Sequence, residues 1–188
     1  MTPRLILASA SPRRAKLLTE AGIVFEVKPS KVDERVPRKI APAQAAVDIA
    51  ERKAKAVKAP DSWVLAADTL IDYGGRVVGK PADEVEAHAI LRMLSGTEHW
   101  VITGVAIVGP KGETKVGIAQ SRVVFHEISD QQIDDYIRTG DPMDKAGAYG
   151  AQGRAKAFIK QVEGPMDNVI GLPMDTVRKL LADTGYPI

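Results

Sequence analysis

The sequence contains no cysteine among its 188 residues. This absence excludes disulfide bonds, thiolate nucleophiles and cysteine-ligated metal centres. The charge is nearly balanced, with 26 basic and 24 acidic residues and a formal net charge of +2. This balance gives no reason to expect nucleic acid binding, which depends on a strongly basic surface. A protein without cysteine suits the reducing cytoplasm, which is the location that we expect.

Long apolar runs are also missing, and no stretch approaches the length of a membrane span. The first apolar run, Leu5–Ala8, is too short for the core of a signal peptide and is followed closely by Arg13 and Arg14. The sequence has neither a G-x-x-x-x-G-K-[ST] phosphate loop nor a G-x-S-x-G nucleophile elbow. We therefore expect no membrane and no nucleic acid as partners, whereas a small anionic ligand is compatible with the composition.

The spacing of apolar residues predicts strands and helices that alternate along the sequence. The predicted strands are Leu5–Ala8, Phe25–Lys28, Trp63–Asp72, Arg76–Val78, Glu98–Val108, Thr114–Phe125 and Ala155–Val162. The predicted helices are Pro12–Ala21, Ala43–Lys58, Asp83–Leu94, Asp130–Arg138 and Pro173–Asp183. Hairpins mixed with helical crossovers predict an α/β fold with a mixed sheet flanked by helices. No convincing linker interrupts residues 1–188, so we expect a single domain.

The segment from Ser9 to Arg14 joins the first predicted strand to the first predicted helix. Ser11 suits the N-cap and Pro12 the first helical position. Arg13 and Arg14 would then lie in the first turn, where the helix dipole opposes each cation by roughly 0.3–1 kcal/mol. An anion held by the helix N-terminus, the serine hydroxyls and both guanidinium groups would explain them. The alternative is that both arginines point into solvent.

Two charged residues lie at positions that otherwise look apolar. Asp68 interrupts the predicted strand Trp63–Asp72, and a buried carboxylate is costly unless it is paired or bound to metal. Lys53 falls on the apolar face of the predicted helix Ala43–Lys58. We interpret Asp68 as functional rather than as a bulge residue bonded to nearby backbone. Lys53 either extends from the edge of the core or reaches a buried anion.

A glycine-rich segment, Asp144–Gly153, carries glycine at every third position from Gly147. Glycine allows the backbone to approach a ligand closely. Tyr149 could stack or pack there, and Gln152 offers the donor and the acceptor that the edge of a uracil or thymine ring needs. The alternative is a flexible surface loop. Lys80 lies in Gly79-Lys80-Pro81, and this local sequence alone is typical of an ordinary loop lysine.

Several motifs resemble those of the Maf family of nucleoside triphosphate pyrophosphatases, in order from the first strand to the last helix. They are Leu5–Arg14, Asp33-Glu34-Arg35, Ala66-Ala67-Asp68-Thr69, Gly79-Lys80-Pro81, Leu94-Ser95-Gly96, Asp144–Gly150 and Val169-Ile170-Gly171-Leu172-Pro173. The resemblance implies an elongated, two-lobed domain with a central cleft, a cytoplasmic location and a homodimer. It also implies hydrolysis of a nucleoside triphosphate to the monophosphate and pyrophosphate with a divalent metal. The sequence Gly147–Gly153 is similar to the branch that acts on dTTP and UTP, and modified pyrimidine nucleotides are further possible substrates.

The same resemblance implies roles for individual residues. Asp68 matches the proton acceptor of the reaction. Arg13, Thr69 and Gln152 match the positions associated with substrate choice. The other matching site positions are Ser9, Arg14, Glu34, Lys53, Lys80 and Lys145. Of these, we expect Ser9, Lys145 and the cations Arg13, Arg14, Lys53 and Lys80 to bind phosphate, because a triphosphate needs positive charge around it.

A metal ion helps to explain how Asp68 could act as a base. An ordinary aspartate, with a pKa of about 3.9, is a weak base towards bulk water. A bound metal can lower the pKa of a water molecule by several units. We therefore expect Asp68 to serve as metal ligand and base, with Glu34 as a second ligand and Asp144 as a weaker candidate. Oxygen ligands of this kind suit Mg²⁺ or Mn²⁺.

Two alternatives stay open at the level of sequence. The first is the same chemistry on 7-methyl-GTP. The second is a non-enzymatic protein that binds nucleotide and regulates cell division. Metal-dependent release of pyrophosphate separates the second alternative from an enzyme, and a comparison of substrates separates the first.

Overall fold

The structure, a computed structural model, describes residues 4–35 and 40–187. Within these ranges it contains a seven-stranded sheet in the order β2-β1-β3-β5-β6-β7, with β4 paired to β3. The strands are β1 (Leu5–Leu7), β2 (Glu26–Val27), β3 (Trp63–Tyr73), β4 (Arg76–Val78), β5 (Glu98–Val108), β6 (Thr114–Phe125) and β7 (Ile159–Glu163). β1 is parallel to β2 and β3, and the other pairs are antiparallel. The predicted mixed sheet is confirmed.

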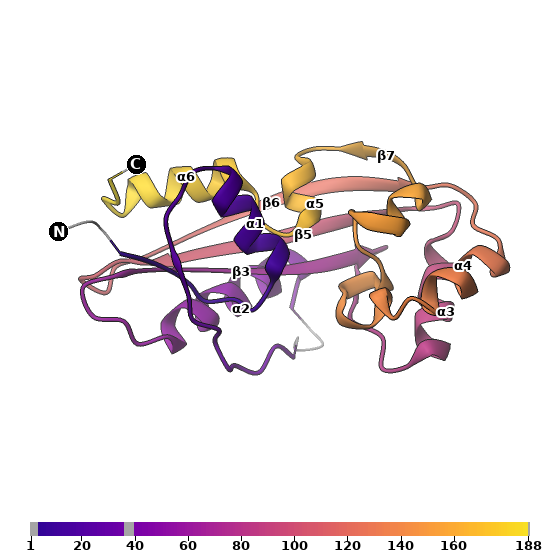
Figure 1. Cartoon of the computed structure of the whole chain (residues 1–188), viewed down its shortest axis with the longest axis horizontal. Helices are drawn as coiled ribbons and strands as arrows, with labels where there is room; N and C mark the ends of the chain where they lie inside the picture. The colour runs from indigo at the N-terminus through magenta and orange to yellow at the C-terminus, as the bar shows by residue number, and fades with distance from the viewer. Residues whose placement is uncertain (1–3, 36–39, 188) are drawn as a thin grey trace.

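Helices cover both faces of this sheet. α2 (Pro42–Ala56) packs on one face across β3 and β5. α1 (Pro12–Glu20), α5 (Met166–Ile170) and α6 (Met174–Asp183) lie on the other face, whereas α3 (Glu84–Leu94) and α4 (Asp130–Ile137) pack together at one end of the elongated molecule (Figure 1). In the part of the sequence that the structure describes, no helix is long and apolar enough to cross a bilayer.

The alternation of side chains along β1 shows how the two faces are filled. Leu5 and Leu7 belong to the core beneath α1 and α6, whereas Ile6 and Ala8 belong to the core beneath α2. Successive residues of a strand point to opposite faces, so an apolar run with both faces covered is buried throughout. A further core cluster lies at the end of α3 and α4 and includes Phe125. Separate cores at the two ends agree with the predicted two lobes.

An opening in the sheet lies along one edge of β3. β1 pairs with β3 from Trp63 to Leu65, and β4 pairs with the same edge from Ile71 to Tyr73. β5 pairs with the opposite edge from Val64 to Asp72. Among the described residues, no strand therefore pairs with the first edge over residues 66–70. Asp68 lies in the middle of this interval.

A close contact between α2 and β5 occurs at Gly104. A Cβ atom at this position would lie 2.4 Å from the backbone carbonyl carbon and oxygen of Ala46 in α2. Gly104 is also the cross-strand neighbour of Asp68. Glycine therefore allows α2 to lie directly on the sheet beside Asp68, and the next turns of the helix deliver Lys53 there.

Two details differ from the sequence prediction. The predicted strand Ala155–Val162 begins only at Ile159, because Gly153–Phe158 forms a 3₁₀ segment. Ala155 and Phe158 are its buried residues, and their spacing of three matches a 3₁₀ turn rather than the alternation of a strand. The prediction also missed α5, a helix of five residues that ends at Gly171 in the left-handed conformation.

Candidate functional site

All ten residues that the sequence analysis singled out line one cleft of about 1050 Å³. They are Ser9, Arg13, Arg14, Glu34, Lys53, Asp68, Thr69, Lys80, Lys145 and Gln152. The cleft opens where β3 lacks a partner between β1 and β4, so it lies at the carboxyl end of β1. Open α/β sheets commonly bind ligands outside the carboxyl ends of their strands. Its volume suits a small organic ligand rather than a metal ion alone.

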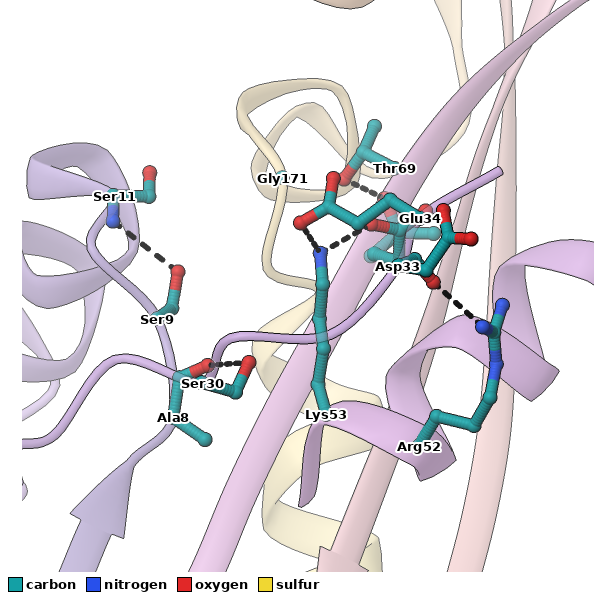
Figure 2. Close-up of polar contacts among 12 residues, drawn as sticks. Ala8, Ser9, Ser11, Ser30, Asp33, Glu34, Arg52, Lys53, Thr69 and Gly171 are labelled. Atoms are coloured by element: carbon teal, nitrogen blue, oxygen red, sulfur yellow. Dashed lines mark hydrogen bonds and ion pairs between the residues drawn. The ribbon is translucent and has the colours of Figure 1, made fainter. Parts of the chain in front are cut away.

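Lys53 connects two carboxylates at the centre of the cleft. Its Nζ atom donates to Asp68 Oδ1 at 2.6 Å and lies 2.8 Å from Glu34 Oε1. Lys53 and Asp68 are both buried, whereas Glu34 is about half exposed. Figure 2 shows the Lys53 side chain extending to Glu34, beside the contact in which Arg52 Nη1 donates to the Asp33 carbonyl oxygen at 2.5 Å. Of the two alternatives for Lys53, the structure shows the one that reaches a buried anion.

The surroundings shift the acidity of both carboxyl groups. Burial raises the pKa of Asp68, and the nearby Lys53 ammonium and Arg14 guanidinium oppose that rise. Partial burial also opposes ionisation of Glu34, but the hydrogen bond and charge of Lys53 outweigh it, so the pKa of Glu34 lies below its ordinary value. The two carboxyl groups therefore differ: Glu34 is held ionised, whereas Asp68 is the stronger base.

The start of α1 matches the prediction, but its two arginines differ. Ser11 is the N-cap, and its hydroxyl accepts from the Arg14 amide. The Arg14 side chain donates to the Gly171 carbonyl oxygen at 2.8 Å and to the hydroxyls of Ser9 and Thr69 at 3.2 Å each. Arg14 therefore holds neighbouring parts of the cleft in place. Among the described residues, Arg13 has no hydrogen bond or ion pair with its guanidinium group, which lines the cleft.

The other two predicted phosphate-binding lysines have different surroundings. Lys80 is mostly exposed, and its Nζ atom lies 3.8 Å from Glu34 Oε2. Lys145 is buried, and its Nζ atom donates to Asp141 Oδ1, the Asp141 carbonyl oxygen and Asp144 Oδ1 at 2.5–2.9 Å. An ammonium group has three donors, so these contacts use all that Lys145 possesses. Lys80 and Arg13 are therefore the cations most available to a phosphate in this structure.

The glycine-rich segment is partly buried and is not simply a surface loop. Tyr149 packs against Phe125 and His99, with ring centroids at 4.8 and 5.4 Å. Gly147 has a φ of 70°, and a Cβ atom there would lie 2.8 Å from the Ile71 side chain. The tyrosine thus anchors the segment to the core, and this leaves Gln152 exposed at the wall of the cleft.

A sequence model described as Maf-like protein matches residues 4–184. The chain belongs to the Maf family. Three curated relatives, each named dTTP/UTP pyrophosphatase, are similar over nearly the whole chain. They come from Geobacillus sp. (strain WCH70), with 49% identity over 94% of this chain and 96% of the relative; Moorella thermoacetica, with 46% over 98% and 97%; and Anaeromyxobacter dehalogenans, with 44% over 100% and 97%. The predicted family is confirmed.

Asp68 and Glu34 are the carboxylates of this Maf protein that would supply oxygen ligands to a divalent cation. In this structure the Lys53 ammonium lies between them and compensates their negative charge. The described residues contain no group of three or more His, Cys, Asp or Glu side chains that could hold a metal ion on their own. Mg²⁺ is often bound by one or two carboxylates together with substrate phosphates, so two protein ligands suffice when nucleotide is present.

Sequence reasoning missed three residues that organise this Maf site. Thr103 lies beneath Thr69, Gly104 lies beside Asp68, and Asn168 joins α5 to the sheet through Val101 and Ser121. The only signal for the first two was a threonine and a glycine within the apolar strand Glu98–Val108. Their importance depends on strand register, which the sequence alone does not give.

The buried His99 should make the stability of the folded protein fall at acid pH. Burial lowers its pKa to about 4, and its Nε2 atom lies 2.7 Å from Tyr149 Oη. The unfolded state has an ordinary histidine with a pKa of about 6.5, so it binds more protons than the folded state between these values. The contribution to stability is therefore present above pH 6.5 and is lost as the pH falls towards 4, about 3 kcal/mol in all. Denaturant unfolding at pH 7 and pH 4.5 should show a smaller loss in His99→Gln than in the wild type. Equal losses in both proteins would contradict this assignment.

Proposed function

We propose that this Maf protein hydrolyses dTTP and UTP to the nucleoside monophosphate and pyrophosphate, with a divalent metal, and so removes nucleotides from the pool. The observation that carries the proposal is the agreement between relatives named dTTP/UTP pyrophosphatase, similar at 44–49% identity, and one cleft that gathers every predicted site residue. Modified pyrimidine nucleotides are included in the proposed substrate range. We further propose that residues 1–188 act as one catalytic domain, built on the common sheet.

The chemistry begins with a water molecule beside Asp68. Asp68 takes a proton from this water, whose oxygen then forms a bond to the α-phosphorus of the substrate. The bond between the α-phosphorus and the bridging oxygen breaks, and pyrophosphate leaves. The raised pKa of Asp68 makes it a better proton acceptor than an exposed aspartate.

Cationic side chains stabilise the charge that develops on the phosphates. Arg13 and Lys80 are placed to bind them directly, whereas Arg14 holds Ser9 and Thr69 in position. Asp68 and Glu34 would hold Mg²⁺ or Mn²⁺, with Asp144 as a weaker candidate. When bound, the cation supplies neutralisation of phosphate charge and lowers the pKa of an attached water molecule. Lys53 keeps the two carboxylates close together.

The direct test is release of pyrophosphate from a panel of nucleoside triphosphates, including purines and 7-methyl-GTP, with Mg²⁺ or Mn²⁺. We expect selective release from dTTP and UTP that is lost when a chelator is added and restored by excess metal. Release from 7-methyl-GTP alone would contradict the proposed substrate. No release from any nucleotide, with binding intact, would favour the non-enzymatic regulator.

Gln152 is the residue that we expect to contact the edge of the base. Gln152→Ala should lower the preference for dTTP and UTP over other nucleotides more than it lowers kcat. The amide can both donate and accept a hydrogen bond, and it lies exposed on the wall of the cleft. The measurement is kcat/KM across the same panel, with Gln161→Ala on the exposed strand β7 as control. An unchanged substrate profile in Gln152→Ala would contradict this role.

Location and assembly are also part of the proposal. The nucleotide pool lies in the cytoplasm, so an enzyme that acts on it belongs there. A homodimer is supported by exposed apolar side chains on β5 and β6, namely Trp100, Val116 and Ile118. Light scattering coupled to size-exclusion chromatography measures the assembly state directly.

A further inference from the structure

Thr103 lies directly behind Thr69 in the sheet and does not line the cleft. The two residues are opposite one another in the pairing of β3 with β5. The Thr103 side chain is fully buried, whereas Thr69 is partly exposed and contributes to the wall of the cleft. Their Oγ1 atoms are 3.0 Å apart, and Thr103 Oγ1 is also 3.1 Å from the carbonyl oxygen of Asn168.

These contacts determine the direction of each hydrogen bond. A carbonyl oxygen can only accept, so Thr103 donates its one hydroxyl proton to Asn168. Thr103 then has only lone pairs for Thr69, and the Thr69 hydroxyl must donate to it. Arg14 Nη2 lies 3.2 Å from Thr69 Oγ1 and can only donate to it. The series of bonds therefore runs in one direction, from Arg14 through Thr69 and Thr103 to Asn168.

The end of this series is held firmly. Asn168 is fully buried, and its Nδ2 atom donates to the Val101 carbonyl oxygen at 3.0 Å and to Ser121 Oγ at 2.9 Å. Ser121 in turn donates to the Pro165 carbonyl oxygen at 2.9 Å. These bonds fix α5 against β5 and β6, so the Asn168 carbonyl group stays in place as an acceptor. The direction of the whole series is therefore built into the fold.

The consequence for the cleft is that Thr69 offers a ligand only an acceptor. A hydroxyl group has one proton and two lone pairs. The proton goes to Thr103 and one lone pair to Arg14, which leaves one lone pair. Gly171 keeps the approach open, because a Cβ atom there would lie 3.3 Å from Thr69 Oγ1. A phosphate oxygen needs a donor, so Thr69 is suited to a ligand N–H or O–H group instead.

We infer that Thr103 is a positioning residue for substrate choice, because it fixes the Thr69 hydroxyl as an acceptor for the N3–H group of uracil or thymine. This inference rests on the proposed function and deepens it. Uracil and thymine carry a donor at N3, whereas cytosine carries a lone pair there. Cytosine would therefore place a lone pair against the remaining lone pair of Thr69, and the site rejects it.

The test is to remove the hydrogen bond from Thr69 to Thr103 and to measure whether CTP becomes a substrate. Thr103→Val removes the acceptor behind Thr69, so the Thr69 hydroxyl can rotate and donate to cytosine N3. We expect kcat/KM for CTP to rise and the UTP-to-CTP ratio to fall about tenfold, the effect of roughly one hydrogen bond. Thr103→Ser keeps the hydroxyl and should keep the wild-type ratio. A gain with CTP is an outcome that simple destabilisation does not produce.

Thr184→Val is the matched structural control. It makes the same substitution at a buried threonine outside the cleft, whose hydroxyl donates to the carbonyl oxygens of Leu180 and Leu181 at 3.0 Å, so the melting temperature should fall while the ratio stays unchanged. If Thr103→Val does not fold by circular dichroism, Thr103→Cys replaces it, because a thiol accepts hydrogen bonds only weakly. The same fall in ratio is expected.

The failure of this inference differs from the failure of the proposed function. If the wild type releases pyrophosphate from UTP but Thr103→Val leaves the UTP-to-CTP ratio unchanged, or lowers both activities equally, Thr103 does not set the choice of base. If the wild type discriminates poorly between UTP and N3-methyl-UTP, Thr69 does not accept from N3–H and the inference also fails. If the wild type releases pyrophosphate from neither UTP nor dTTP, the proposed function fails with it.

Discussion

Asp68→Asn should abolish pyrophosphate release and leave nucleotide binding in place. Asparagine keeps the shape of the side chain but cannot take a proton from water, so kcat should fall about 10³-fold, within the range for loss of a general base. Arg13 and Lys80, the residues proposed to bind phosphate, have no hydrogen bond or ion pair with Asp68 among the described residues and should still hold the substrate. The measurements are single-turnover release of pyrophosphate and calorimetric binding of UTP.

Asp72→Asn is the control for this substitution. Asp72 lies on the same face of β3 as Asp68, and its side chain accepts a hydrogen bond from the Gly75 amide at 2.8 Å. Asparagine can accept the same bond, so turnover should stay at the wild-type level. Simultaneous loss of turnover, binding and circular dichroism signal in Asp68→Asn would show a structural role for Asp68 and contradict the catalytic one.

Gly104→Ala should both destabilise the protein and inactivate it. The added methyl group would lie 2.4 Å from backbone atoms of Ala46, and the backbone cannot rotate away as a side chain can. α2 must shift off the sheet, so we expect a loss of about 3 kcal/mol in the free energy of unfolding, the upper part of the usual range for overpacking. The same shift withdraws Lys53 from Asp68, so kcat should fall in the fraction that stays folded.

Urea unfolding and turnover below the melting temperature measure these two effects separately. Gly112→Ala is the comparison, because Gly112 has a φ of 85° and no atom within 4 Å of an added Cβ. It should show the cost of backbone strain without the displacement of α2, and its turnover should stay unchanged. A Gly104→Ala protein with full activity would show that the position of α2 does not determine catalysis.

Local patterns predicted much of the fold. Glu98–Val108 and Thr114–Phe125 are strands with the predicted bounds, because β-branched residues recur along each of them and neither contains proline. Ser11 and Pro12 likewise placed the start of α1 correctly. The predicted strand Ala155–Val162 was wrong over residues 155–158, because a short apolar spacing does not distinguish a 3₁₀ turn from a strand until its partners are known.

The sequence predicted which residues line the cleft but not which contacts they make with one another. The ten residues were identified by unusual positions and by resemblance, and the structure brings all of them to one cleft. Their individual roles are still predictions. Lys145 was expected to bind phosphate, yet Asp141 and Asp144 occupy its three donors. Such contacts depend on how distant segments pack, as does the alignment of Thr69 with Thr103.

The alternation of side chains along β3 has a consequence for how substrate preference can diverge. Asp68 points towards α2 and Lys53, whereas the next residue, Thr69, points towards Arg14 and α5. The proposed sites of bond cleavage and of base recognition thus lie on opposite sides of one strand. With these proposed roles, mutations on the α5 side would alter which nucleotide is accepted while Asp68 and Lys53 stay intact. Deletion of one residue in β3 before Asp68 would exchange the two sides and remove both abilities at once.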